Sequence, residues 1–139
     1  MKITLNRIND DYLFECKNAA GNKILLDNTS QPDAKGVSPM ESVLMAVAGC
    51  SGIDVVSILK KQRQEIKNFS AEVEGERVQV DEAKPFKKIM VKFLLEGEID
   101  PKKAQKAAEL SFEKYCSVSK TLEPNVEVQF EVFVNGVVV

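Results

Sequence analysis

Apolar and polar residues alternate at the start of the chain, which predicts a group of short β-strands. Residues 2–8, 11–17 and 23–27 form alternating runs that are separated by turn-forming residues. We expect these runs to pair as a three-stranded meander. A loop is expected over residues 28–37, which contain a proline and a glycine.

A strong helix start signal follows this loop. Ser38 offers an N-cap side chain, Pro39 occupies the first helical position and Glu41 the third, which is the pattern of a capping box. The helix is expected to continue to about Gln64, and the basic residues near that end suit its C-terminal pole. The first half of this helix has no polar face, so it must be enclosed on all sides.

A second alternating region and a second helix complete the pattern. Residues 69–80 and 89–95 alternate as two half-exposed strands do. An Asp-Pro pair at 100–101 marks the start of another helix, with the aspartate as its N-cap. One more helical turn is expected over residues 117–122. The chain then alternates again over residues 126–134, which predicts a final strand.

The predicted element order is βββ-α-ββ-α-β, and runs of antiparallel strands separated by helices indicate the α+β class. Nothing in the sequence resembles a linker or an internal repeat, so residues 1–139 are expected to form a single domain. One small sheet cannot enclose a helix that is apolar on every side. We therefore expect an obligate, intertwined homodimer in which two such central helices pack together and the antiparallel sheets wrap around them.

Composition narrows the functional classes. With 44% hydrophobic and 29% charged residues, the chain has the composition of a soluble globular protein and not of a disordered one. Its net charge of −2 and the lack of a basic stripe argue against nucleic-acid binding. The N-terminus lacks the apolar core of a signal peptide, and Asp54 interrupts the one long apolar stretch. We expect a cytoplasmic protein without a membrane segment.

The chain contains no histidine, which excludes a histidine base or a histidine metal ligand. Its three cysteines form no CxxC motif, which argues against a zinc knuckle and a thioredoxin-type site. An odd number of cysteines without close pairs is also not a disulfide framework. No metal site and no cofactor are therefore expected.

Two of the cysteines are candidates for chemistry. Cys50 stands between two glycines of residues 48–52, and glycines inside a helix cost about 1 kcal/mol each, which is tolerated where a second helix or a substrate approaches closely. Cys116 falls at a helix junction near Lys120, where the pKa of a thiol can be lowered. Taken alone, both are also consistent with simple packing roles. Cys16 is expected to be a core-facing strand residue.

The segments around these cysteines resemble a known family. Residues 36–50, Gly-Val-Ser-Pro-Met-Glu-Ser-Val-Leu-Met-Ala-Val-Ala-Gly-Cys, resemble the first-cysteine helix of the OsmC/Ohr family. Residues 115–120, Tyr-Cys-Ser-Val-Ser-Lys, resemble its second-cysteine segment, usually a Cys-Pro-Val-Ser-like run. The helix, the cysteine spacing and the strand order extend the resemblance over nearly the whole chain. The run that follows, Gly-Cys-Ser-Gly-Ile-Asp-Val-Val-Ser-Ile-Leu, is most similar to the OsmC-like branch.

The resemblance implies an antioxidant enzyme of the stress response, a thiol peroxidase that reduces organic hydroperoxides. The family's first cysteine matches Cys50, which would attack the peroxide as a thiolate and become a sulfenic acid. The second matches Cys116, which would condense with it to a disulfide. An external thiol or dithiol would then reduce that disulfide. The family's glutamate falls on Glu41.

Helix geometry separates two carboxylates near Cys50. Glu41 lies nine residues before it, about 13–14 Å and roughly 900° of turn along a helix, which places the two on opposite faces. If both serve one site, the helix must bend or Glu41 must come from the other subunit. Asp54 lies four residues after Cys50 and shares its face. Its carboxylate would raise the thiol pKa unless a cation offsets it, or it would form a hydrogen bond to a neighbouring element.

The chain departs from the family pattern at its arginine. The family's arginine belongs to the N-terminal meander, close to its first turn, whereas Arg7 of this chain lies slightly before that turn with no supporting motif and is more typical of an exposed strand residue. Lys23 and Lys120 are other candidates for the positive charge, and Ser117 replaces the usual proline. A second hypothesis therefore stays open, a non-catalytic or redox-sensing dimer that binds a small apolar molecule between its central helices. A purely structural dimer would leave the paired thiols unexplained.

Overall fold

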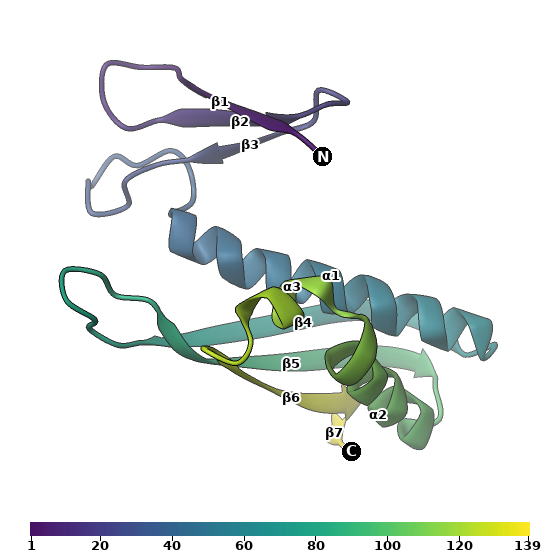
Figure 1. Cartoon of the computed structure of the whole chain (residues 1–139). Coiled ribbons are helices and arrows are strands. Elements are labelled where there is room, and N and C mark those ends of the chain that lie inside the picture. Colours follow the sequence, from purple (N-terminus) through teal and green to yellow (C-terminus); the bar gives the residue numbers. More distant parts are fainter. The chain divides into compact units, whose positions relative to one another are not determined.

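The computed structural model describes residues 1–139 and divides them into two compact units, residues 1–43 and residues 44–139. The elements follow one another in the order βββαββ, then three consecutive helical segments, then ββ (Figure 1). The predicted α+β class is confirmed. Whether the whole chain acts as the single domain expected above stays a prediction.

The first unit is a small antiparallel sheet with the start of the long helix. Its strands are β1 (Ile3–Arg7), β2 (Phe14–Asn18) and β3 (Lys23–Leu26), paired in the order β1-β2-β3. The predicted meander is thus present, with slightly shorter strands.

The predicted capping box begins helix α1 (Pro39–Lys61). The backbone N–H of Glu41 donates to Ser38 Oγ at 3.0 Å, and the N–H of Ser38 donates to Glu41 Oε1 at 2.9 Å. The helix ends at Lys61 and not at Gln64, because Arg63 adopts a left-handed φ of 58°. The N–H groups of Arg63 and Gln64 then bond back to the carbonyls of Lys60 and Leu59, as in a Schellman motif.

The second unit holds a four-stranded sheet with helices on one face. Besides the rest of α1, its elements are β4 (Glu65–Arg77), β5 (Phe86–Glu98), α2 (Pro101–Leu110), the π-helix η1 (Ser111–Tyr115), α3 (Ser117–Leu122), β6 (Glu127–Val134) and β7 (Val137–Val138). The strand order is β4-β5-β6-β7.

One strand pair differs from the expected antiparallel pattern. Strands β5 and β6 are parallel, with Val91 opposite Phe130, whereas β4 with β5 and β6 with β7 are antiparallel. A parallel pair needs a long crossover, and α2, η1 and α3 form it. The segment that carries Cys116 is therefore a crossover over the sheet.

A row of aromatic rings marks the covered face of this sheet. Phe69 of β4, Phe93 of β5, Phe112 of η1 and Phe130 of β6 follow one another with ring centroids 5.2–6.1 Å apart. A Cβ atom on Gly52 would lie 3.2 Å from the Phe69 ring, so α1 packs closely on β4. Helix α1 and the η1 segment thus lie on the same face of the sheet (Figure 1).

Helix α1 is only partly covered within the chain. It is long and apolar enough to cross a membrane by length and composition alone, a test that the core helix of a soluble protein also passes. Only 28% of its most apolar window is buried. Met45 is 54% exposed and Ile53 is 70% exposed, so α1 presents an apolar side without a partner in this chain.

Candidate functional site

Two of the three cysteines lie together in the second unit. Cys50 is half-buried on α1 and Cys116 is fully buried between η1 and α3, and both are free thiols. Cys50 lies close enough to Cys116 to raise the pKa of the Cys116 thiol. Cys16 is half-buried on β2, in the other unit. The fold therefore brings the first and second predicted cysteines into one site.

The backbone around Cys116 holds its thiol in place. The π-helix η1 ends there, because Cys116 takes an extended conformation, with φ −70° and ψ 99°. Its N–H donates to the carbonyl of Ser111 at 2.7 Å. Its sulfur accepts from the N–H of Ser119 at 3.4 Å, and Ser119 Oγ donates to the Cys116 carbonyl at 3.0 Å. The cysteine is thus the N-cap of α3.

Burial sets the protonation state of Cys116. Desolvation raises its pKa above the usual value for a thiol, because the buried site penalises the thiolate. The hydrogen bonds from Ser119 act in the opposite direction, and the neighbouring Cys50 adds to the increase. At neutral pH the group is therefore a protonated thiol.

The glycines beside Cys50 have different roles. Gly52 faces the Phe69 ring and lets α1 approach β4, whereas nothing lies within 4 Å of a Cβ atom built on Gly49. One glycine therefore serves close packing inside the chain. The other leaves open space beside Cys50, which a substrate or a second helix could occupy.

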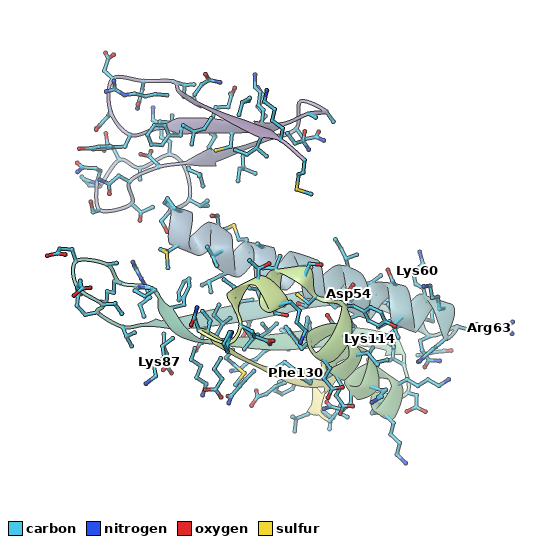
Figure 2. All side chains as sticks on the ribbon, in the orientation of Figure 1. Asp54, Lys60, Arg63, Lys87, Lys114 and Phe130 are labelled. Atoms are coloured by element: carbon cyan, nitrogen blue, oxygen red, sulfur yellow. The ribbon has the colours of Figure 1, made fainter.

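Asp54 forms a hydrogen bond to a neighbouring element, which was one of the two roles considered for it from the sequence. Its carboxylate accepts a hydrogen bond from Ser111 Oγ at 2.8 Å. Ser111 is fully buried, and its carbonyl accepts the N–H of Cys116. Figure 2 shows Asp54 on α1, at the side where the helical crossover passes. Asp54 therefore ties the helix of Cys50 to the segment of Cys116.

Glu41 and Arg7 lie in the first unit, and each has partners there. Hydrogen bonds from Ser38 lower the pKa of the Glu41 carboxyl, which caps α1. The exposed Arg7 guanidinium donates to the backbone carbonyls of Asp10 and Asp11 and so closes the turn after β1. The structure thus gives both residues a local structural role.

The two candidate lysines form ion pairs of their own. Lys23 lies 3.5 Å from Glu15, and Lys120 lies 3.3 Å from Glu123. Both pairs are exposed enough to contribute little to stability. No group of three or more cysteine, aspartate or glutamate side chains is arranged to hold a metal ion.

Sequence reasoning missed a pocket beside this site. It has a volume of about 370 Å³ and lies between α1 and the crossover; we call it the α1–η1 pocket. Its lining residues are Asp54, Ser57, Ile58, Lys61, Gln62, Leu110 and Tyr115. These residues come from segments about 50 positions apart in the chain, so no local sequence motif could predict the pocket.

A second, shallower hollow of about 400 Å³ follows the exposed side of α1. It is mainly apolar, and Gly49, Ile53 and Phe69 are among its lining residues. It coincides with the uncovered part of the helix and with the open space at Gly49. The two hollows therefore differ in chemistry, one polar in part and one apolar.

Comparison with known proteins places this fold and sequence in a family. The family model described as OsmC-like protein matches residues 32–131. Protein YhfA of Escherichia coli K12 is 41% identical over 116 residues, which cover 83% of this chain and 84% of YhfA. The crystal structure of a hypothetical protein from Aquifex aeolicus is 32% identical with a TM-score of 0.80, and the match covers 96% of both chains. OhrB of Bacillus subtilis, an organic hydroperoxide resistance protein, shares the fold at 21% identity, with a TM-score of 0.65 over 95% of this chain and 96% of OhrB.

Proposed function

Because the chain belongs to the OsmC-like protein family, we propose that it is a thiol peroxidase that reduces organic hydroperoxides. The observation that carries the proposal is the pairing of a half-exposed thiol, Cys50, with a buried one, Cys116. An accessible thiol can meet a substrate, and a protected thiol beside it can resolve the product.

In the proposed first step, the Cys50 thiolate attacks the O–O bond of the hydroperoxide. A sulfur–oxygen bond forms, the O–O bond breaks, and the alkoxide leaves as an alcohol after taking up a proton. Cys50 becomes a sulfenic acid. The Cys50 side chain is only half-buried, so a hydroperoxide can reach it from solvent.

In the second step, Cys116 attacks the sulfur of the Cys50 sulfenic acid. The disulfide forms, and the hydroxyl group leaves as water together with the proton of Cys116. Because burial holds the pKa of Cys116 high, this thiol stays protonated and unreactive towards solvent oxidants until the sulfenic acid forms beside it. An external thiol or dithiol then returns both cysteines to the reduced state.

Asp54 and Ser111 are positioning residues in this scheme. Their hydrogen bond connects α1 to η1, and the Ser111 carbonyl in turn holds the N–H of Cys116. They do not touch the reacting atoms. Their contribution is to keep the two sulfur atoms within reach of each other.

We also propose that the protein is a homodimer, with a second copy against the exposed side of α1. Met45 and Ile53 are more than half exposed, and Gly49 between them allows a second helix to approach closely. Leaving such a side in water would forgo about 25 cal/mol for each Å² of apolar surface. Location in the cytoplasm stays a prediction.

A non-catalytic dimer that binds a small apolar molecule is the alternative, and the apolar hollow along α1 favours it. Product analysis separates the two functions. Reduced protein is mixed with one equivalent of cumene hydroperoxide, its thiols are counted, and its cysteine peptides are mapped. The peroxidase predicts that two of the three thiols disappear as a Cys50–Cys116 disulfide.

Three variants sharpen this assay. Cys50→Ser should retain all its remaining thiols, and Cys116→Ser should accumulate a sulfenic acid that dimedone traps. Cys16→Ser is the matched control, since Cys16 lies on β2 in the other unit, and it should still form the disulfide. Unchanged thiols in the unmodified protein would remove the peroxidase proposal and favour the binding protein.

A further inference from the structure

Two hydrogen-bond donors lie beside the buried Cys116 sulfur, and both belong to Ser119. The N–H of Ser119 donates to Cys116 Sγ at 3.4 Å, and the Ser119 hydroxyl donates to the Cys116 carbonyl at 3.0 Å. Both residues are fully buried. The N–H and the side chain of Ser119 each lower the pKa of the Cys116 thiol. Ser119 is thus the residue whose donors favour the charged form of this sulfur.

The Ser119 hydroxyl is free to change its partner. A serine hydroxyl carries one proton, which rotates to suit its neighbours. The Cys116 carbonyl that accepts this proton also accepts the N–H of Lys120 at 3.1 Å. The carbonyl therefore keeps a partner when the hydroxyl turns away, so the rotation leaves no buried acceptor unpaired.

The other titratable and charged groups around Cys116 do not stabilise a thiolate. On α1, Cys50 raises the pKa of Cys116, and Asp54 is bonded to Ser111. The charged residues in the paired parts of β5 and β6 lie on the face of the sheet away from the row of aromatic rings: Lys88, Lys92, Glu127 and Glu131. The charged residues of η1 and α3 that flank the cysteine are exposed: Glu113, Lys114 and Lys120. A thiolate in this buried site therefore depends on Ser119.

We propose that the Ser119 hydroxyl turns from the Cys116 carbonyl to the Cys116 sulfur when that thiol gives up its proton, and so stabilises the thiolate that attacks Cys50. Its part in resolving the Cys50 sulfenic acid rests on the proposed function. The contact between the hydroxyl and the thiolate does not.

The rotation suits the chemistry of the resolving step. Cys116 attacks the Cys50 sulfur as a thiolate, and its proton leaves with the hydroxyl of the sulfenic acid as water. The negative charge on Cys116 exists only until the sulfur–sulfur bond forms. A bond from the Ser119 hydroxyl to that charge is therefore stronger during the attack than in the resting thiol, which is the condition for accelerating a step.

The size of the effect follows from thiol chemistry. Hydrogen bonds to charged groups are about twice as strong as neutral ones, so loss of the hydroxyl should lower the thiolate fraction of Cys116 at pH 7 by about tenfold. A less stabilised thiolate is also a better nucleophile, which restores about threefold in rate at a Brønsted coefficient of ~0.4–0.5. We therefore expect Ser119→Ala to slow the attack on Cys50 by about three- to fourfold.

The protonation of Cys116 is measured on the reduced full-length protein, without peroxide. The cysteine Cβ NMR signals are followed against pH after assignment with cysteine-to-serine variants. Ser119→Ala should move the onset of the Cys116 titration to higher pH. Ser119→Thr should restore it, because a threonine hydroxyl in a helix can bond to the carbonyl three residues earlier. Ser117→Ala, an exposed serine of the same helix, is the matched control and should titrate normally.

The attack itself is measured with an artificial leaving group. In a Cys16→Ser background, 5,5′-dithiobis(2-nitrobenzoate) converts Cys50 to a mixed disulfide and releases one coloured thiolate. The Cys116 thiolate then attacks the Cys50 sulfur, forms the disulfide and releases the second coloured thiolate. Ser119→Ala should slow this second release by about three- to fourfold at pH 7, and Ser117→Ala should leave it unchanged.

The outcomes separate this proposal from the peroxidase. Equal rates in Ser119→Ala and the unmodified protein would overturn the role of Ser119, as would slower release without a moved Cys116 titration, which is the result expected of a purely structural residue. If Ser119→Ala shows both effects but cumene hydroperoxide oxidises no cysteine, the peroxidase proposal fails and the Ser119 contact stands. If cumene hydroperoxide forms the disulfide but Ser119→Ala shows neither effect, the reverse holds.

Discussion

Replacing Ser111 by alanine tests whether the link between α1 and the crossover positions Cys116. The fully buried Ser111 hydroxyl donates to Asp54 at 2.8 Å, and this bond joins residues 57 positions apart. A hydrogen bond to a charged group contributes about 1.5–3 kcal/mol to stability. Asp54 is only half-buried, and water can partly replace the lost donor. We therefore expect Ser111→Ala to lower the free energy of unfolding by about 1–2 kcal/mol.

The same change should slow one chemical step and spare the other. Oxidation of Cys50 by peroxide should keep its rate, because Ser111 lies on the side of Cys116. Disulfide formation should slow by roughly tenfold, since a misplacement of about 1 Å can cost up to ~10²-fold. Urea unfolding measures the change in the free energy of unfolding. Rapid mixing with dimedone trapping separates the rate of Cys50 oxidation from the rate of disulfide formation.

The matched control is Ser70→Ala, which changes an exposed serine on β4. A double-mutant cycle of Ser111→Ala with Asp54→Ala should give a coupling energy of about 1 kcal/mol or more. The reasoning is refuted if the two single variants are additive, or if Ser111→Ala forms the disulfide at the rate of the unmodified protein.

Three further predictions concern pH, packing and assembly. Because burial raises the pKa of Cys116, the rate of disulfide formation from preformed Cys50 sulfenic acid should increase about tenfold per pH unit from pH 6 to 8; a plateau by pH 7 would contradict the assignment. Gly52→Val would push a branched side chain against the Phe69 ring and should destabilise the fold by about 1–3 kcal/mol in urea unfolding, and a free energy of unfolding equal to that of the unmodified protein would contradict the packing role of Gly52. Ile53→Asp should convert the proposed dimer to a monomer in sedimentation velocity, with Val137→Asp, on an exposed terminal strand, as a control that stays dimeric; an unmodified protein that sediments as a monomer would refute the dimer.

Local signals in the sequence were sufficient to predict where the helices begin. The capping box of Ser38 and Glu41 and the N-cap of Asp100 both form the expected bonds, because each pairs residues within three positions. The predicted end of α1, at about Gln64, lies beyond its observed end at Lys61. The helix stops because Arg63 adopts a left-handed conformation, which has no sequence signature comparable to a glycine.

Long-range pairings account for what the sequence did not reveal. An alternating strand has the same pattern in a parallel and an antiparallel pair, so the direction of β5 against β6 could not be read from periodicity. The hydrogen-bond partner of Asp54 is a serine 57 positions away, which no local pattern in the sequence could predict. The two cysteines were found because a family resemblance, not spacing alone, connected them.

The most direct test of the account is the rate at which Cys50 reacts with an organic hydroperoxide. Reduced protein is mixed anaerobically with cumene hydroperoxide and, separately, with hydrogen peroxide in a stopped-flow instrument, alongside Cys50→Ser and Cys116→Ser. The account predicts oxidation orders of magnitude faster than that of a free thiol, faster with cumene hydroperoxide, abolished by Cys50→Ser and retained in Cys116→Ser. Oxidation of the unmodified protein at the rate of a free thiol would contradict it.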